Sequence, residues 1–170
     1  MIDITITLSD LQKQQKDIFE VIQEPYPLVV TALTTAQATT YINDKISTAK
    51  SDITDFITMF TSIKDYDDEG DYINYTSEIL NINTIKLYVV WYILYLTYYD
   101  LYNRKVDLKP LSDLENRKDN SNYEKLAYNY EAFIRNPETK KMNQSFLTAL
   151  SGLKLPSDLG ISCDWQFYRG

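Results

Sequence analysis

The residues of this sequence best suited to metal chemistry lie in one acidic segment, Asp65 to Asp71 (DYDDEGD). A calcium loop of the EF-hand type needs oxygen ligands at positions 1, 3 and 5, a glycine at 6 and a bidentate glutamate at 12. Asp65, Asp67, Glu69 and Gly70 meet the first four requirements, but position 12 is a threonine. The carboxylates of Asp65, Asp67, Glu69 and Asp71 are therefore a weak calcium candidate. A solvated turn is the interpretation that we favour, and we expect no metal and no cofactor.

Other catalytic arrangements have little support. The chain has no histidine, which removes the commonest general base, and its one cysteine, Cys163, allows no internal disulfide and no multi-cysteine zinc site. Asp100 is a possible catalytic carboxylate because it adjoins the most apolar segment. An ordinary ion pair with Arg104, four residues later, is a sufficient explanation for a carboxylate at this position. The Ser-x-x-Lys pattern at Ser47 and Ser151 lacks the elements that give this motif meaning. We expect neither a catalytic residue nor an enzyme.

Charge and hydropathy narrow the function classes further. The 170 residues include 17 Lys and Arg against 24 Asp and Glu, a net charge of −7, which disfavours a surface that tracks nucleic-acid phosphates. The N-terminus lacks the features of a signal peptide. The most apolar stretch, Leu87 to Tyr99, is shorter than the about 20 residues of a spanning helix. We expect one intracellular domain, with this stretch as a buried helix and no membrane contact.

The first half of the chain has patterns of both strand and helix. Alternating isoleucines over Ile2–Thr7 predict a short half-buried strand. A capping-box pattern at Ser9–Gln12 predicts a helix over about 10–23, which the prolines that follow would end. Apolar residues at steps of three and four predict a long amphipathic helix over about 36–63. After the acidic segment, a second long helix is expected over about 76–103.

The second half has several helix-start signals. Capping-box patterns at Ser112–Glu115 and Ser121–Glu124 predict a short turn of helix and then the start of a longer helix. Asn136–Pro137 predicts a further helix start, with Gly152 as its stop. Alternation over Ile161–Tyr168 is a strand pattern.

The fold class that these patterns predict is all-α, a bundle of about four to five helices with short N- and C-terminal β segments. We divide the chain into a helical bundle domain, 1–152, and a C-terminal extension with a strand, 153–170, that serves docking or an interface. The terminal strands could pair with each other, or one could be donated to a neighbouring chain. The sequence leaves both arrangements open.

The chain has 15 tyrosines, and five of them form one stripe on the second long helix, at steps of four, three, four and three. With the neighbouring apolar stripes they cover nearly the whole circumference, so we expect protein on most sides of this helix. Tyrosines can also stack single-stranded bases, but few basic residues lie nearby, and packing or a subunit interface is the favoured interpretation. The interface candidates are Tyr88, Trp91, Tyr92, Tyr95, Tyr99, Tyr102, Trp165 and Phe167.

The order of elements resembles a family of small helical proteins in the necks of tailed bacteriophages, the head-completion or head–tail adaptor proteins. The resemblance rests on four segments: Ile4–Leu11 (ITITLSDL), the helix with Ile42, Ile46, Ile53 and Ile57, Tyr88–Arg104 (YVVWYILYLTYYDLYNR) and Asn122–Phe133 (NYEKLAYNYEAF). The chain departs from the family in residues Asn136 to Gly170, which follow the counterpart of the family's last helix, where family members usually have only a brief tail. The family has no catalytic residues to carry over.

The resemblance implies a structural protein that forms a homo-oligomeric ring in the virion neck, after assembly in the host cytoplasm. Its partners would be itself, the portal, and tail or neck proteins, with double-stranded DNA passing through without sequence-specific binding. An acidic lumen would repel phosphates and let the duplex slide. The lumen candidates are Asp65, Asp67, Asp68, Glu69 and Asp71. The alternative is a soluble monomeric protein-binding or regulatory module that uses an aromatic surface.

Overall fold

We describe the protein from a computed structural model, which covers residues 2–23, 32–60, 66, 69–71, 75, 81–107 and 114–151. The side chains of residues 82, 83, 104–107, 114–121 and 151 are outside the description. Within this part the fold is all-α, as the sequence predicts, and contains no β-sheet. Its helices are α1 (Leu8–Gln14), α2 (Ile18–Gln23), α3 (Thr35–Phe60), α4 (Ile82–Asp107), α5 (Leu114–Ile134) and α6 (Gln144–Ser151).

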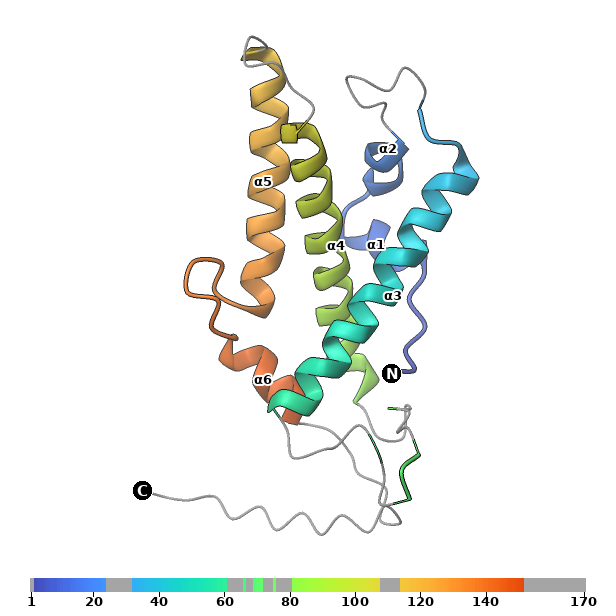
Figure 1. The fold of residues 1–170 in the computed structure, drawn as a ribbon, viewed down its shortest axis with the longest axis vertical. Helices are drawn as coiled ribbons and strands as arrows, with labels where there is room; N and C mark the ends of the chain where they lie inside the picture. The colour runs from blue at the N-terminus through green and yellow to red at the C-terminus, as the bar shows by residue number, and fades with distance from the viewer. Residues whose placement is uncertain are drawn as a thin grey trace.

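Helix α4 is the centre of the arrangement (Figure 1). It runs beside α5 along most of its length, α3 crosses it obliquely on the other side, and α1 and α6 also contact it. Its side chains at Ile85, Val89 and Ile93 are fully buried. The expectation that protein surrounds this helix on most sides is confirmed. Its observed bounds lie somewhat later in the chain than the predicted range of about 76–103.

The N-terminal segment is not a strand of a sheet, which corrects our prediction of an N-terminal β segment. Ile2, Ile4 and Ile6 are buried, as their alternation predicts, but within the described residues the backbone of this segment forms one parallel bridge, between Ile2 and Tyr75. The Ile2 amide donates instead to the hydroxyl of Thr54 on α3, at 3.1 Å. The segment is therefore an extended chain packed on helices. The predicted C-terminal strand, 161–168, lies outside the described residues.

The helix predicted over about 10–23 is two short helices. The capping box is formed by Thr7 and Asp10, two residues earlier than predicted, with the Thr7 amide donating to Asp10 Oδ2 at 3.0 Å. Gln15 then has extended backbone angles and ends α1. The break reorients the chain, and Ile18 and Ile22 of α2 are fully buried in the core.

Two predicted helix starts in the second half are wrong. Residues 114–134 form one helix, so the pattern at Ser121 lies inside α5. Asn136 does not begin a helix, because its side chain accepts the amides of Glu138 and Thr139, both at 2.9 Å, in a turn. Lys140 completes this turn in the left-handed region, with φ 57°. Helix α6 begins only at residue 144.

Aromatic rings connect the helices around α4. Phe146 of α6 is fully buried and lies between Phe56 of α3 and Tyr88 of α4, with ring centroids at 6.2 and 5.2 Å. Tyr88 in turn meets Trp91 edge to face at 5.3 Å. Edge-to-face and offset pairs of this kind add to the stabilisation from buried area. The rings therefore fix the small helix α6 against both long helices.

Candidate functional site

An aromatic surface that solvent still reaches lies where α4 meets α5. The Trp91 ring stacks on Phe133 of α5, with centroids 4.1 Å apart and an interplanar angle of 18°. Phe133 is 44% exposed, and Leu87, one turn before Trp91 on α4, is 38% exposed. Residues four apart share a helix face, so the three side chains adjoin. We call Leu87, Trp91 and Phe133 the aromatic ledge.

The end of α1 positions the aromatic ledge. The Trp91 indole Nε1 donates to Gln14 Oε1 at 3.4 Å. The Tyr130 hydroxyl of α5 donates to the Gln14 carbonyl at 3.5 Å and to Gln15 Oε1 at 3.4 Å. Helices α4 and α5 are thus both hydrogen-bonded to the point where α1 ends. This arrangement holds the Trp91–Phe133 stack in one orientation.

A surface hollow of about 200 Å³ adjoins the aromatic ledge. It lies between α1 and α4, and Leu87 belongs to both the hollow and the ledge. Typical small-molecule pockets have about 300–1,000 Å³, so this hollow has the size for one side chain of a partner. Its lining residues are Asp10, Lys13, Gln14, Lys86, Leu87 and Val90.

Among the described residues that line the hollow, the charged groups are two lysines and one carboxylate. Asp10 lies 3.0 Å from the Lys86 ammonium and 3.7 Å from that of Lys13. Burial alone would raise the pKa of Asp10, but hydrogen bonds from the Thr7 amide and from Lys86 outweigh it and lower this pKa from 3.8 to about 2. Asp10 is therefore ionised at neutral pH, and the three groups together carry one net positive charge.

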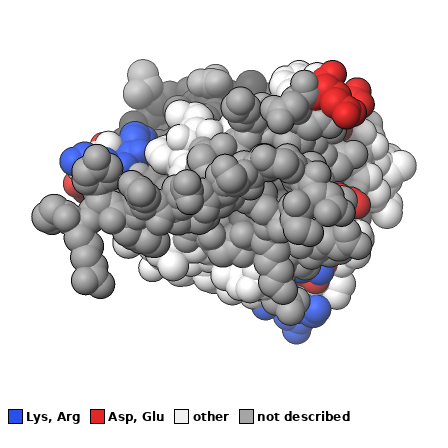
Figure 2. Space-filling view, turned by 90° about the horizontal axis from the view of Figure 1, so that it is seen from below, with Lys and Arg blue, Asp and Glu red and all other residues white. Residues whose placement is uncertain are grey.

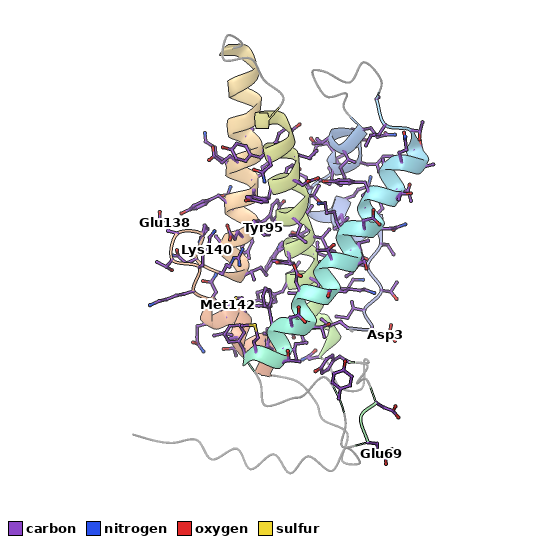
Figure 3. The ribbon with its side chains drawn as sticks, in the orientation of Figure 1. Asp3, Glu69, Tyr95, Glu138, Lys140 and Met142 are labelled. Atoms are coloured by element: carbon purple, nitrogen blue, oxygen red, sulfur yellow. The ribbon has the colours of Figure 1, made fainter. Side chains whose placement is uncertain are left out.

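A second charged cluster, at the end of α5, surrounds one buried carboxylate. Glu131 is 5% exposed, and its Oε1 accepts from Arg135 Nε at 2.6 Å and from Lys140 Nζ at 2.8 Å. Arg135 also donates to the Tyr95 hydroxyl of α4 at 3.2 Å. Figure 3 shows Tyr95 on α4 and Lys140 in the turn that follows α5. The cluster ties that turn, and α6 beyond it, to the long helices.

The interface candidates occupy unlike positions. Tyr92 and Tyr95 are buried within the chain itself, Tyr88, Trp91 and Tyr102 are half-buried, and Tyr99 is 50% exposed. Trp165 and Phe167 lie outside the described residues. Of the described candidates, Tyr99 is the most exposed, and Tyr88, Trp91 and Tyr102 each keep part of their surface in solvent. Which of them meet another chain stays a prediction.

The acidic segment is described at Tyr66 and at residues 69–71, while Asp65, Asp67 and Asp68 lie outside the described residues. Glu69 and Asp71 are exposed, and Gly70 between them has a φ of 89°, a turn conformation that suits glycine. Across the described part of the chain, no three acidic or cysteine side chains gather in a group that could hold a metal ion. From the end of the molecule that carries Glu69, Figure 2 shows a group of Asp and Glu side chains at one edge, apart from two groups of Lys and Arg.

Asp100 has partners that sequence spacing missed. Its Oδ2 accepts from the Tyr41 hydroxyl of α3 at 2.6 Å and lies 3.5 Å from Lys45 Nζ. The side chain of Arg104, its predicted partner, is outside the described set. Tyr41 and Lys45 are four residues apart on one face of α3, and this spacing is the only local signal that could have found the pair.

No family model matches the sequence, and no curated protein and no solved structure is significantly similar to it. None of the described helices combines the length and the apolar character that a membrane crossing requires. The arguments for a function therefore come from the surfaces of the chain.

Proposed function

We propose that this protein is a structural, ring-forming adaptor of a bacteriophage neck that links the portal to the tail around the DNA channel. The observation that carries the self-associating part of the proposal is the aromatic ledge. The place in a phage neck rests on the resemblance in the order of elements. The action of such a protein would be mechanical: it joins neighbouring subunits and partners through packed surfaces.

The composition of the aromatic ledge supports a protein–protein contact. Tryptophan and phenylalanine are enriched in the centres of interfaces, where large rings contribute much area at little rotamer cost. Phe133 is 44% exposed even though it stacks on Trp91, whereas other rings of the same helices, such as Tyr98, are fully buried. Hydrogen bonds from Trp91 and Tyr130 to Gln14 hold this surface in place before a partner binds, which lowers the entropy cost of binding.

The charge of the chain supports the DNA-channel part of the proposal. A net charge of −7 and exposed carboxylates at Glu69 and Asp71 give a surface that repels phosphates. A ring that placed these groups toward its lumen would let the duplex pass. Reversal of charge at these positions should then change genome retention or ejection, and an unchanged phenotype would count against the lumen role.

The oligomeric state tests the self-associating part. We expect light scattering and native mass spectrometry of the purified chain, alone and mixed with the portal of its phage, to find a closed oligomer. Phe133→Asp should weaken that assembly at least tenfold, because it places a charge in the interface centre. Tyr128→Asp is the matched control, since Tyr128 is similarly exposed, at 48%, on another face of α5. A chain that stays monomeric in both conditions would overturn the proposal.

The alternative, a monomeric protein-binding module, is favoured by one observation, the hollow of about 200 Å³ beside the ledge. A hollow sized for one side chain suits a peptide partner as well as a subunit. A monomer that binds one defined partner, with binding lost in Phe133→Asp and kept in Tyr128→Asp, would support this alternative. A portal or capsid gene beside the gene for this chain would support the adaptor.

A further inference from the structure

We propose that the hollow between α1 and α4 receives the side chains of Tyr66, Glu69 and Asp71 of a second copy of this chain, in a head-to-tail contact. The inference rests on the proposed self-association and names the two surfaces that meet. It commits to a heterologous interface, in which one surface of each copy binds a different surface of the next. Interfaces of this kind close into rings when the rotation between copies permits.

The receiving surface combines apolar contact with exposed positive charge. Leu87 and Val90 supply apolar side chains, and Leu87 continues into the aromatic ledge. The Lys13 side chain is 71% exposed and that of Lys86 is 35% exposed. Asp10 lies between these lysines and neutralises one of the two charges, so that a carboxylate arriving from outside still meets a net cation. On a chain of net charge −7, such a site is a local exception.

The donated surface has the complementary features. Tyr66 is 55% exposed, and the exposed carboxylates of Glu69 and Asp71 follow it closely in the sequence. A tyrosine ring suits a hollow of about 200 Å³ with apolar walls, and its hydroxyl can remain at the wet edge. The carboxylates would then lie near Lys13 and Lys86 at the rim. Opposed charges of this kind orient the partners and raise the rate of association.

The two surfaces belong to different parts of the chain. The described side chains that line the hollow come from α1 and α4, and none comes from the described residues of the acidic segment. Figure 3 shows Glu69 beyond the end of the helical part. One copy therefore presents both halves of the contact at separate places, as a repeating head-to-tail assembly requires.

Zero-length cross-linking of the wild-type chain tests this contact directly. Copies with natural nitrogen are mixed with copies labelled with nitrogen-15 and treated with a carbodiimide, which joins lysine to carboxylate without a spacer. We expect peptides that contain Lys13 or Lys86 joined to Glu69 or Asp71, with the two isotopes mixed. Links between peptides of the same isotope only, or no links in a sample that light scattering finds oligomeric, would overturn the inference.

Charge reversal gives a second, independent test. Lys13→Glu and the double variant Glu69→Lys/Asp71→Lys should each raise the dissociation constant of self-association at least tenfold at low salt, and the combined triple variant should recover most of the loss. Lys125→Glu, an exposed change on α5, is the control and should leave association unchanged. Circular dichroism melts of each variant establish that the fold is intact.

The outcomes separate this inference from the proposed function. An oligomer that forms normally and is insensitive to these reversals overturns the head-to-tail contact and leaves self-association standing. A wild-type chain that forms no oligomer, alone or with the portal, overturns both. A peptide from another protein that binds the hollow, in a sample with no mixed-isotope links, assigns the site to that partner instead.

Discussion

Helix α4 contacts its two long neighbours in different ways. Toward α3, tyrosine hydroxyls donate to carboxylates across the interface: Tyr92 to Asp52 at 2.8 Å and Tyr41 to Asp100 at 2.6 Å. Toward α5, the contacts include stacked rings, with Tyr98 lying over Tyr130 at an interplanar angle of 4°. One helix thus has a carboxylate-anchored side and a ring-stacked side.

The hydroxyl of Tyr98 marks the contrast most clearly. The ring is fully buried between Tyr123, at 5.9 Å, and Tyr130, at 6.0 Å, and its hydroxyl has no hydrogen-bond partner among the described residues. Burial, with smaller effects from Tyr130 and Asp17, raises the pKa of Tyr98 well above its usual range. On the opposite side burial also raises the pKa of Tyr92, and the hydrogen bond to Asp52 adds to that rise.

The difference teaches that one residue type stabilises this fold in two ways. A hydroxyl–carboxylate bond is directional, so it fixes how far α3 can slide along α4. Stacked rings contribute buried area and tolerate small sliding movements, because their attraction depends weakly on offset. Variants that remove the hydroxyl or the whole ring should therefore act unequally on the two sides of α4.

The largest effect is expected from Tyr98→Ala. Removal of a fully buried ring leaves a cavity, and the free energy of unfolding should fall by about 3–5 kcal/mol, as for other aromatic-to-alanine changes in cores. Urea denaturation followed by circular dichroism measures it. Tyr99→Ala, at a ring that is 50% exposed, is the neighbouring control and should cost about 1 kcal/mol or less. Equal losses at both positions would contradict the burial contrast.

A smaller loss of unfolding free energy is expected when the hydroxyl of Tyr92 is removed on the α3 side. Tyr92→Phe keeps the ring contact with Phe56, centroids 5.7 Å apart, and removes the bond to Asp52. A double-mutant cycle with Asp52→Ala, which removes the acceptor, should give a coupling free energy of about 1 kcal/mol, since the acceptor is charged but only part-buried. A coupling free energy near zero would mean that the α3 side is held by packing alone.

The long helices could be predicted from the sequence because their apolar periodicity repeats over many helical turns. Apolar residues at helical spacing predicted both long helices: the predicted range of about 36–63 matches α3 closely, whereas the predicted range of about 76–103 begins six residues before α4 begins and ends four residues before α4 ends. The alternation at Ile2, Ile4 and Ile6 correctly gave the buried face. The same alternation wrongly predicted a strand, because a strand also needs a partner backbone. Among the described residues, Ile2 has a bridge to Tyr75 and a hydrogen bond to the Thr54 hydroxyl.

Short local patterns were less informative. A Ser-x-x-Glu spacing caps a helix only where the chain enters it, and the same spacing at Ser121 occurs inside α5. The candidate site was predicted only in part. Trp91 was named from its residue type, whereas Phe133 and Gln14 reach it from α5 and α1, across tertiary distances that no local pattern encodes. The Tyr41–Asp100 bond, across 59 residues, was missed for the same reason.

Acid should weaken a third carboxylate contact of α4, that between Asp10 of α1 and Lys86. The folded state holds the pKa of Asp10 at about 2, below its ordinary 3.8, so as pH falls between these values the unfolded chain takes up the proton first. The stabilisation is therefore complete above about pH 4 and is lost as pH approaches 2. Solvent near this pair limits it to about 1 kcal/mol.

Denaturation of the wild type and Asp10→Asn at several pH values measures this contribution. The difference in free energy of unfolding should be present at pH 5 and shrink toward pH 2.5. Asp3→Asn, at an exposed carboxylate of the N-terminal segment, is the control. A difference that stays constant with pH would show that Asp10 acts by shape and not by charge.

The smallest change in unfolding free energy is expected from Tyr98→Phe, and it tests whether the α5 side of α4 depends on hydrogen bonds. Tyr98→Phe removes a hydroxyl that has no partner among the described residues and keeps the stack with Tyr123 and Tyr130. Burial of an unpaired polar group is unfavourable, so the free energy of unfolding should stay within about 0.5 kcal/mol of wild type or rise. Tyr92→Phe on the other side should instead lower it. A loss at Tyr98 as large as at Tyr92 would mean that its hydroxyl donates to an ordered water, and that both sides of α4 depend on hydrogen bonds.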